Sequence, residues 1–194
     1  DHFGMTRRLG IVEIGLQLER GQYGAAIRKA GPVDIRIDLE ILLIDIAGDN
    51  DDKVADAASA VVHMANARNA EGFIAVSPEA RHRFWSDRAR TAAISAHTNA
   101  FKINEDVVVP VSQIPALVSG LEALSKRFAI PIVNFGHAGN GNIHVNLLTN
   151  PDDPEESERA RDCLDAMFTL VLQLGGTLSG EHGIGLEKRD FVAR

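Results

Sequence analysis

The spacing of apolar residues predicts a chain that mixes strands and helices. Short apolar runs typical of strands lie at 40–47, 72–77, 101–110, 131–135 and 142–148. Helical spacing predicts amphipathic helices over about 53–70, 78–95, 114–128 and 155–174, and a last helix beginning at Leu186. Ser77 and Pro78 give the second of these helices a capped start, and Gly175 closes the long one.

The first segment with helical spacing is 11–30. Ile11, Ile14 and Leu18 would lie on one side of a helix there, although several glycines lower the helix propensity. Gly31 and Pro32 end the segment. We therefore expect a helix over 11–30, followed by the strand at 40–47.

The predicted order of elements is strand, helix, strand, helix, strand, helix, hairpin, helix. The hairpin and the short connections favour an α+β fold, a ferredoxin-like sandwich in which helices cover a largely antiparallel sheet. No GxGxxG run follows the first strand, so a dinucleotide-binding Rossmann unit is not expected. A chain of 194 residues can bury a core, and we expect 1–194 to form a single domain.

Charge and cysteine content narrow the range of partners. The net charge of −7 argues against nucleic acid. The one cysteine, Cys163, lies in a helical pattern, where we expect a core position; it suits a reducing compartment and a cytoplasmic location. No apolar run is long enough for a transmembrane segment. The first residue is not Met and the last residues read as a helix interior, so we expect a fragment of a longer protein.

Candidate chemistry begins in the run FGHAGNGNIHVN at 135–146. Gly and Asn between the two flanking strands are turn residues, since both tolerate positive φ. His137 and His144 flank the turn, and we expect them to face each other across the ladder, with Cβ atoms roughly 5 Å apart. Asn146 lies two residues beyond His144 and should point to the same face.

The run GGTLSGEHGIG at 175–185 adds a carboxylate and a third imidazole. Two imidazoles and one carboxylate drawn from the two runs are the ligand set of an open divalent metal site. Glu181 and His182 are neighbours and should point to opposite sides, so one could bind a metal while the other transfers a proton. Gly180 and Gly183 would let a ligand or cofactor approach the backbone closely.

Taken in this order, the two motifs resemble those of the FAD-linked oxidase C-terminal domain. This is the cap, or substrate, domain of flavoproteins of the vanillyl-alcohol oxidase type, which include D-lactate dehydrogenases, the glycolate oxidase flavin subunit and D-2-hydroxyglutarate dehydrogenase. The resemblance implies an FAD-dependent enzyme that oxidises a D-2-hydroxy acid to the 2-oxo acid. It also implies that the FAD-binding domain lies upstream and is absent from this chain. The electron acceptor is not identified by the sequence. A peripheral contact with a membrane through that acceptor is therefore left open.

The resemblance also implies roles for individual residues. His182 would be the general base, and His137, His144 and Glu181 would hold a divalent metal, with Zn²⁺ first and Mn²⁺ or Fe²⁺ compatible with the same ligands. The run FWSDR at 84–88 resembles the family's Trp-x-x-Arg, so Arg88 would bind the substrate carboxylate. The remaining expected contacts are Lys102 and Asn146 to the substrate, and Asn142, Gly180 and Gly183 to the cofactor.

One departure from the family pattern keeps other functions open. The family has Asp between the glycines of the hairpin where this chain has Asn140, which removes a negative charge near the site. One alternative is a metal-dependent hydrolase, although no His-Glu-x-x-His helix is present. A second alternative is a non-catalytic binding domain that kept the fold.

Overall fold

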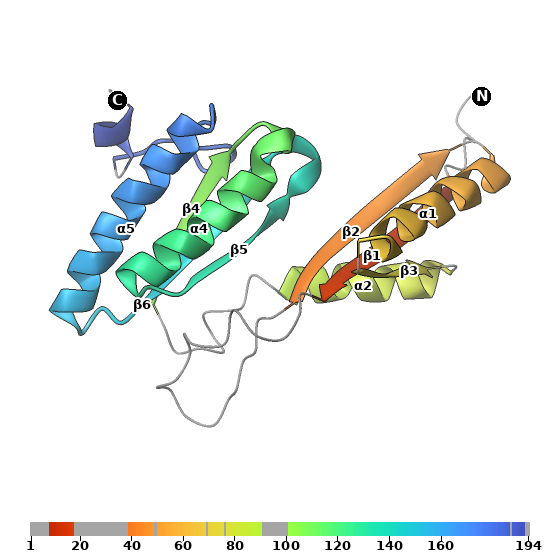
Figure 1. Cartoon of the computed structure of the whole chain (residues 1–194), viewed down its shortest axis with the longest axis horizontal. Coiled ribbons are helices and arrows are strands. Elements are labelled where there is room, and N and C mark those ends of the chain that lie inside the picture. The colour runs from red at the N-terminus through yellow and green to blue at the C-terminus, as the bar shows by residue number, and fades with distance from the viewer. Residues whose placement is uncertain are drawn as a thin grey trace, which may run out of the picture. The chain divides into compact units, whose positions relative to one another are not determined.

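The structure is a computed structural model that describes residues 8–17, 39–48, 50–68, 70–75, 77–90, 101–186 and 188–192. These residues divide into two compact units, an N-terminal unit up to Arg90 and a C-terminal unit from Phe101 (Figure 1). Each unit has its own sheet and is described by itself. The prediction that 1–194 forms a single domain stays a prediction.

The N-terminal unit is a three-stranded antiparallel sheet with two helices. Its elements are β1 (Arg8–Gln17), β2 (Leu39–Gly48), α1 (Asp51–Asn66), β3 (Ala70–Ala75) and α2 (Pro78–Arg90). The strand order is β2–β1–β3, so β2 and β3 lie on either side of β1 and are joined through α1.

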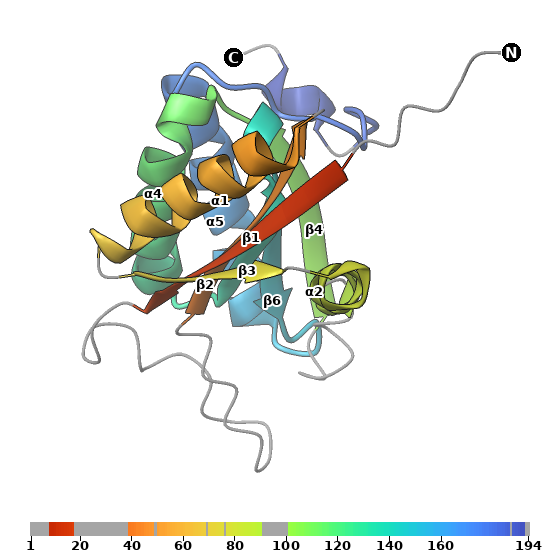
Figure 2. The same cartoon turned by 90° about the vertical axis from the view of Figure 1, so that its right-hand side faces the viewer.

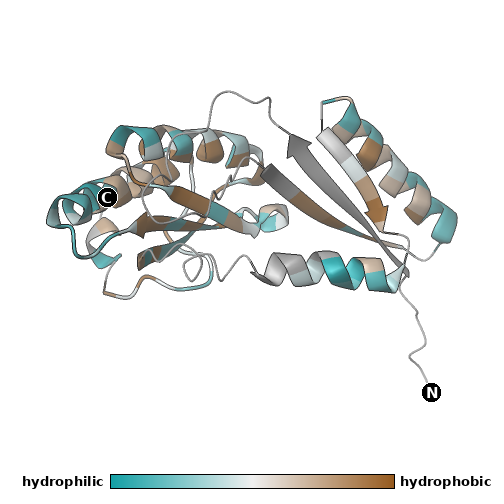
Figure 3. Cartoon of the chain, turned by 90° about the horizontal axis from the view of Figure 1, so that it is seen from below, coloured by the Kyte–Doolittle hydropathy of each residue, from teal (hydrophilic) through white to brown (hydrophobic). Residues whose placement is uncertain are grey.

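The two helices of this unit cover opposite faces of its sheet, as Figure 3 shows. Ile44 and Ile46 of β2 pack against the small buried cluster of α1. Asp45 points the other way, and its carboxylate receives a bidentate contact from Arg81 of α2, with Arg81 Nη2 2.7 Å from Asp45 Oδ2. The alternation of side chains along β2 therefore separates an apolar contact with α1 from an ionic contact with α2.

A side chain caps the start of each of these two helices, and the Ser77 cap was predicted from the sequence. The Asn50 side chain accepts a hydrogen bond from the Lys53 N–H at 3.0 Å at the start of α1. The Ser77 hydroxyl accepts one from the Ala80 N–H at 3.2 Å at the start of α2. Both satisfy an N–H group that has no partner within the helix.

The helix predicted over 11–30 is wrong for its first part. Residues 8–17 form β1, the central strand of the sheet, whereas residues 18–38 lie outside the described residues. Read locally, the spacing of Ile11, Val12 and Ile14 is compatible with a helix as well as with a strand. Their β-branched side chains and the two flanking strands favour the extended form.

The C-terminal unit contains every residue of the two glycine-rich runs. Its elements are β4 (Phe101–Val108), η2 (Val111–Gln113), α4 (Ile114–Phe128), β5 (Ile132–His137), η3 (Ala138–Asn140), β6 (Asn142–Thr149), α5 (Pro154–Gln173) and η4 (Arg189–Phe191), where η marks a 3₁₀ turn. In place of the helix predicted from Leu186, the described residues form only η4.

The sheet of this unit has the strand order β4–β6–β5, antiparallel throughout. An isolated antiparallel bridge joins Val108 at the end of β4 to Thr177, after α5. Counting that bridge as a rudimentary fourth strand gives the split βαβ order of the ferredoxin-like fold. The predicted α+β class with an antiparallel sheet against helices is confirmed.

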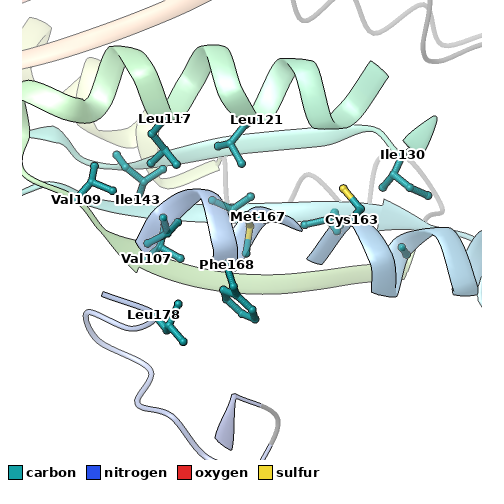
Figure 4. Packing of buried hydrophobic residues seen from close by; sticks show 14 residues of the cluster. Val107, Val109, Leu117, Leu121, Ile130, Ile143, Cys163, Met167, Phe168 and Leu178 are labelled. Carbon is teal, nitrogen blue, oxygen red and sulfur yellow. The ribbon is translucent and has the colours of Figure 1, made fainter. Parts of the chain in front are cut away.

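Helices α4 and α5 cover one face of this sheet (Figure 2). Leu117 and Leu121 of α4 meet Met167 and Phe168 of α5 above the strands, and all four side chains are buried (Figure 4). Cys163 is fully buried in the same cluster, as predicted. Alternate residues of β6, Ile143, Val145 and Leu147, join this core together with Val107 of β4, and the β6 residues between them point to the opposite face.

Candidate active site

Strand β6 places His144 on the sheet face away from α4 and α5. Its neighbours Ile143 and Val145 belong to the core on the helix side, so His144 and Asn146 point to the other face, as predicted. The register pairs His144 with Phe135 and His137 with Asn142. The two histidines are therefore diagonal neighbours rather than directly opposed, which corrects the predicted pairing, and their ring centroids are 5.8 Å apart.

The glycine and asparagine residues from which the turn was predicted do form the turn between β5 and β6. Residues Ala138–Asn140 form η3, and Gly141 follows with φ 80°. The Asn140 side chain accepts a hydrogen bond from the Asn142 N–H at 3.0 Å. Asn140 therefore closes the turn through its side-chain oxygen, an acceptor that an aspartate at this position would also supply.

Glu181 brings its carboxylate to both histidines. Its Oε1 is 3.6 Å from His137 Nε2 and its Oε2 is 3.7 Å from His144 Nε2. One ligand atom from each of the three residues lies within 4.8 Å of the others. Ligand atoms about 2.1 Å from a shared ion at tetrahedral angles would be about 3.4 Å apart. The two nitrogen–oxygen distances are too long for hydrogen bonds and suit a bridging cation, so these residues fit a divalent metal.

The pKa of His144 is lowered, chiefly because burial disfavours its charged form. Glu181 opposes this effect, whereas His182 and His137 add to it. A lowered pKa keeps the imidazole neutral near pH 7, and the neutral ring is the form that binds metals.

His182 lies beside the cluster with different partners. Its ring stacks on that of His144, with centroids 5.4 Å apart and an interplanar angle of 24°. Its Nδ1 is 3.5 Å from Asp106 Oδ1. The side chain of His182 is 40% exposed and that of His144 is 11% exposed, so His182 is the more accessible of these two stacked rings.

Asp106 of β4 is a site residue that the sequence analysis missed. Its side chain is fully buried, and the residue lies directly opposite His144 in the pairing of β4 with β6. Burial alone would raise its pKa, but N–H groups of Glu181, Gly180 and His182 and the Lys188 ammonium hold the pKa of Asp106 well below its ordinary value. An acidic residue directly before the apolar run 107–109 could have indicated a buried carboxylate. Its contact with loop 178–183 could not be predicted, because it depends on contacts between segments far apart in the sequence.

The three residues predicted to bind the substrate do not all lie at the histidine cluster. Lys102 lies on the same face of β4 as Asp106, four residues away, which is roughly 13 Å along a strand. The Asn146 side chain is buried; its Nδ2 donates to the Val133 carbonyl at 3.2 Å, and its Oδ1 has no partner among the described residues. Arg88 belongs to α2 of the N-terminal unit, and its side chain is outside the described part.

The predicted cofactor contacts gather at the turn. Asn142 is buried beside Gly180, and a Cβ added at Gly180 would be 2.6 Å from Asn142 Oδ1. Gly183 has φ 78° and open space around it. The close approach at Gly180 and the positive φ at Gly183 both require glycine.

Residues 36–194 match the family described as FAD linked oxidases, C-terminal domain. The chain is 29% identical over 157 residues to the glycolate oxidase subunit GlcD of Escherichia coli K12, covering 81% of this chain and 31% of that protein. It is 33% identical over 160 residues to a D-lactate dehydrogenase of Anaerostipes hadrus, covering 78% and 32%. A D-2-hydroxyglutarate dehydrogenase of Xanthomonas citri is 31% identical over 153 residues, covering 75% and 31%.

The chain thus spans less than a third of the length of these relatives. Within the described residues, every helix is too short or too polar to cross a bilayer. The match covers the whole C-terminal unit, including both glycine-rich runs and the cluster that they form. The chain belongs to the family of FAD linked oxidases, C-terminal domain.

Proposed function

We propose that this chain is the substrate (cap) domain of an FAD-dependent enzyme that oxidises a D-2-hydroxy acid to the 2-oxo acid. The observation that carries the proposal is the convergence of His137, His144 and Glu181, with His182 stacked at its edge. Family membership and the names of the relatives, which act on glycolate, D-lactate and D-2-hydroxyglutarate by name, support the substrate class.

His182 is the general base in this proposal. It accepts the proton of the substrate hydroxyl, a role that suits an imidazole near neutral pH. Its Nδ1 faces Asp106, so Nε2, on the other side of the ring, is the nitrogen available to the substrate. Its partial exposure allows that approach.

Arg88, Lys102 and Asn146 are proposed to bind the substrate. A guanidinium binds a carboxylate in two parallel hydrogen bonds, which fixes the orientation of a hydroxy acid. Lys102 would add a second positive charge from β4. The buried Asn146 Oδ1, on the face that carries His144, has no hydrogen-bond partner in the part of the chain that the structure describes, which supports a polar contact there.

His137, His144 and Glu181 would hold a divalent metal. Bound there, the ion would act as a Lewis acid and as an orienting template for the hydroxy acid. Zn²⁺ is our first choice for two imidazoles and a carboxylate, and Mn²⁺ or Fe²⁺ accept the same ligands.

FAD would accept the hydride from C2 of the substrate, which is the cofactor's own chemistry. We propose that a separate FAD-binding domain of the full-length protein holds it, with Gly180, Gly183 and Asn142 lying against it. The open space around Gly183 supports a close approach of backbone and cofactor there, whereas Gly180 packs against Asn142. The reduced flavin then needs an electron acceptor, which we leave unassigned.

The proposal is tested on the full-length protein under anaerobic conditions. D-Lactate, glycolate, D-2-hydroxyglutarate and the L forms are mixed with it separately, and flavin absorbance is followed. We expect bleaching by D-lactate, glycolate or D-2-hydroxyglutarate and none by the L forms, with loss of bleaching after chelation. A flavin that none of them reduces would contradict the proposed reaction, and bleaching that survives complete metal removal would contradict the metal's role.

A further inference from the structure

A buried carboxylate holds the loop that carries Glu181 and His182. Three successive backbone N–H groups, those of Gly180, Glu181 and His182, donate to Asp106 Oδ2, at 2.6 Å for Gly180 and 3.2 Å for His182. Consecutive N–H groups that converge on one oxygen form an anion-binding nest. Here the anion is a side chain of the protein itself, on β4.

The second oxygen of Asp106 ties the loop at its ends. Ser179 donates its hydroxyl to Oδ1 at 3.2 Å and accepts a hydrogen bond from the Gly183 N–H at 2.7 Å. Lys188, itself buried, donates to Oδ1 at 3.1 Å and to the Leu178 carbonyl at 2.8 Å. Loop 178–183 is therefore attached to one carboxylate and one ammonium along its whole length.

We infer that Asp106 is a positioning residue of the proposed site, which acts through loop 178–183 to hold the Glu181 carboxylate against His137 and His144 and to set the orientation of the His182 ring. This inference rests on the proposed function. It adds a residue that neither glycine-rich run contains. Asp106 reaches the ligand cluster in register with His144 on one side and through the loop on the other.

Glu105 offers a matched control on the same strand. Like Asp106 it is buried, and its Oε2 is 2.8 Å from Lys188 Nζ. Within the described residues it pairs with Lys188 and makes no hydrogen bond to loop 178–183, because its side chain leaves β4 on the other face. Glu105→Gln therefore removes a charge from the same ammonium without removing the acceptor of the loop amides.

The experiment compares wild type, Asp106→Asn and Glu105→Gln in the full-length protein. Hydrogen–deuterium exchange at the amides of 180–182 needs neither metal nor substrate. We expect about tenfold faster exchange in Asp106→Asn, because hydrogen bonds to a charged acceptor are the stronger kind. The dissociation constant for Zn²⁺ should rise about 10- to 100-fold, and kcat for flavin reduction should fall by a similar factor, as is usual for residues that orient metal ligands.

Glu105→Gln should leave the exchange rates, the Zn²⁺ dissociation constant and kcat near the wild-type values, even if it lowers the melting temperature as much as Asp106→Asn does. Equal changes in the two variants would reduce Asp106 to a residue of general stability and overturn the inference. Unchanged Zn²⁺ affinity and kcat in a folded Asp106→Asn protein would overturn it as well. If Asp106→Asn does not fold, Ser179→Ala removes one donor to the same carboxylate and should shift the three readouts in the same direction by less.

Failure of the proposed function has a different signature. A wild-type protein that binds no Zn²⁺, and whose flavin no hydroxy acid reduces, would refute that function and the catalytic part of this inference. The exchange rates at 180–182 would still show whether Asp106 holds the loop. Fast exchange in the wild type itself would refute the loop attachment directly.

Discussion

At the scale of single residues, Glu181 and His182 are consecutive yet have different partners. Glu181 directs its carboxylate to His137 and His144, whereas the His182 ring lies between His144 and Asp106. One residue would then bind the metal and the other would accept the proton. The two substitutions to alanine should therefore have separable effects.

His182→Ala should slow flavin reduction by about 10² to 10⁴-fold, the usual contribution of a general base. Metal content should stay at the wild-type level, because the ring is not part of the ligand cluster. Stopped-flow reduction and elemental analysis of the full-length protein measure the two quantities. Loss of metal equal to the loss of rate would show that His182 is a ligand.

Glu181→Ala is the complementary change and should lower metal content, since it removes the one carboxylate that contacts both histidines. Elemental analysis after dialysis against a weak chelator is the measurement. Glu158→Ala, on the exposed side of α5, controls for loss of a carboxylate elsewhere. Stoichiometric metal in Glu181→Ala would remove Glu181 from the ligand set.

Cys163 should be unreactive in the folded protein. Burial raises the pKa of its thiol to about 11, so the reactive thiolate is scarce at neutral pH, and the side chain is fully covered. Mass spectrometry of the peptide that contains Cys163, after iodoacetamide treatment with and without urea, should show labelling only in urea. Rapid labelling of the native protein at pH 7 would place the thiol outside the core.

At the scale of elements, local sequence signals predicted the hairpin, whereas the register and the pairing of distant strands could not be read from the sequence. Gly and Asn specify the turn by their own backbone preferences, so its position could be read from the sequence. The register depends on the turn's length, and the four residues between the strands place His137 and His144 diagonally. Pairing of β4 with β6, which brings Asp106 to His144, has no local signature.

The same limit explains the mistaken helix at the N-terminal end of the chain. The short apolar run of β1 is ambiguous between a strand and a helix when it is read locally, and only the pairing with two other strands decides its conformation. By contrast, α4 and α5 were predicted almost to the residue, because amphipathic spacing and the glycine after α5 are local features.

Two glycines of the hairpin turn should differ sharply when replaced. Gly141 has φ 80°, and a Cβ there would meet the Val109 carbonyl oxygen, whereas a Cβ at Gly139 would meet open space. Gly141→Ala should lower the free energy of unfolding by about 2 kcal/mol or more and reduce metal affinity with it. Gly139→Ala should change it by about 0.5 kcal/mol at most. Urea denaturation measures both, and equal effects would contradict the turn geometry.

At the scale of the whole molecule, stability and the proposed chemistry share one buried ionic group. Asp106 and Lys188 form this group and connect β4 to the segment after α5. Glu105 is a second carboxylate beside the same ammonium. A buried ion pair adds little net stability over apolar residues, but loss of one partner is costly because it leaves a buried charge. The chain therefore depends on this carboxylate for both its fold and its loop.

Acid should reveal that dependence. The folded-state pKa of Asp106 lies below its ordinary value, so its contribution to stability is complete above that ordinary value and is lost as pH falls below it. At pH 7, Asp106→Asn should lower the free energy of unfolding by about 3 kcal/mol. The difference between wild type and variant should stay constant from pH 7 to pH 5 and shrink below about pH 4. Urea denaturation followed by circular dichroism at pH 7, 5, 4 and 3 measures it. A difference that grows on acidification would mean that the carboxyl is protonated in the native state. A difference that stays constant down to pH 3 would mean that the loop amides do not stabilise its charge, because the carboxyl would then bind its proton equally well in the folded and unfolded states.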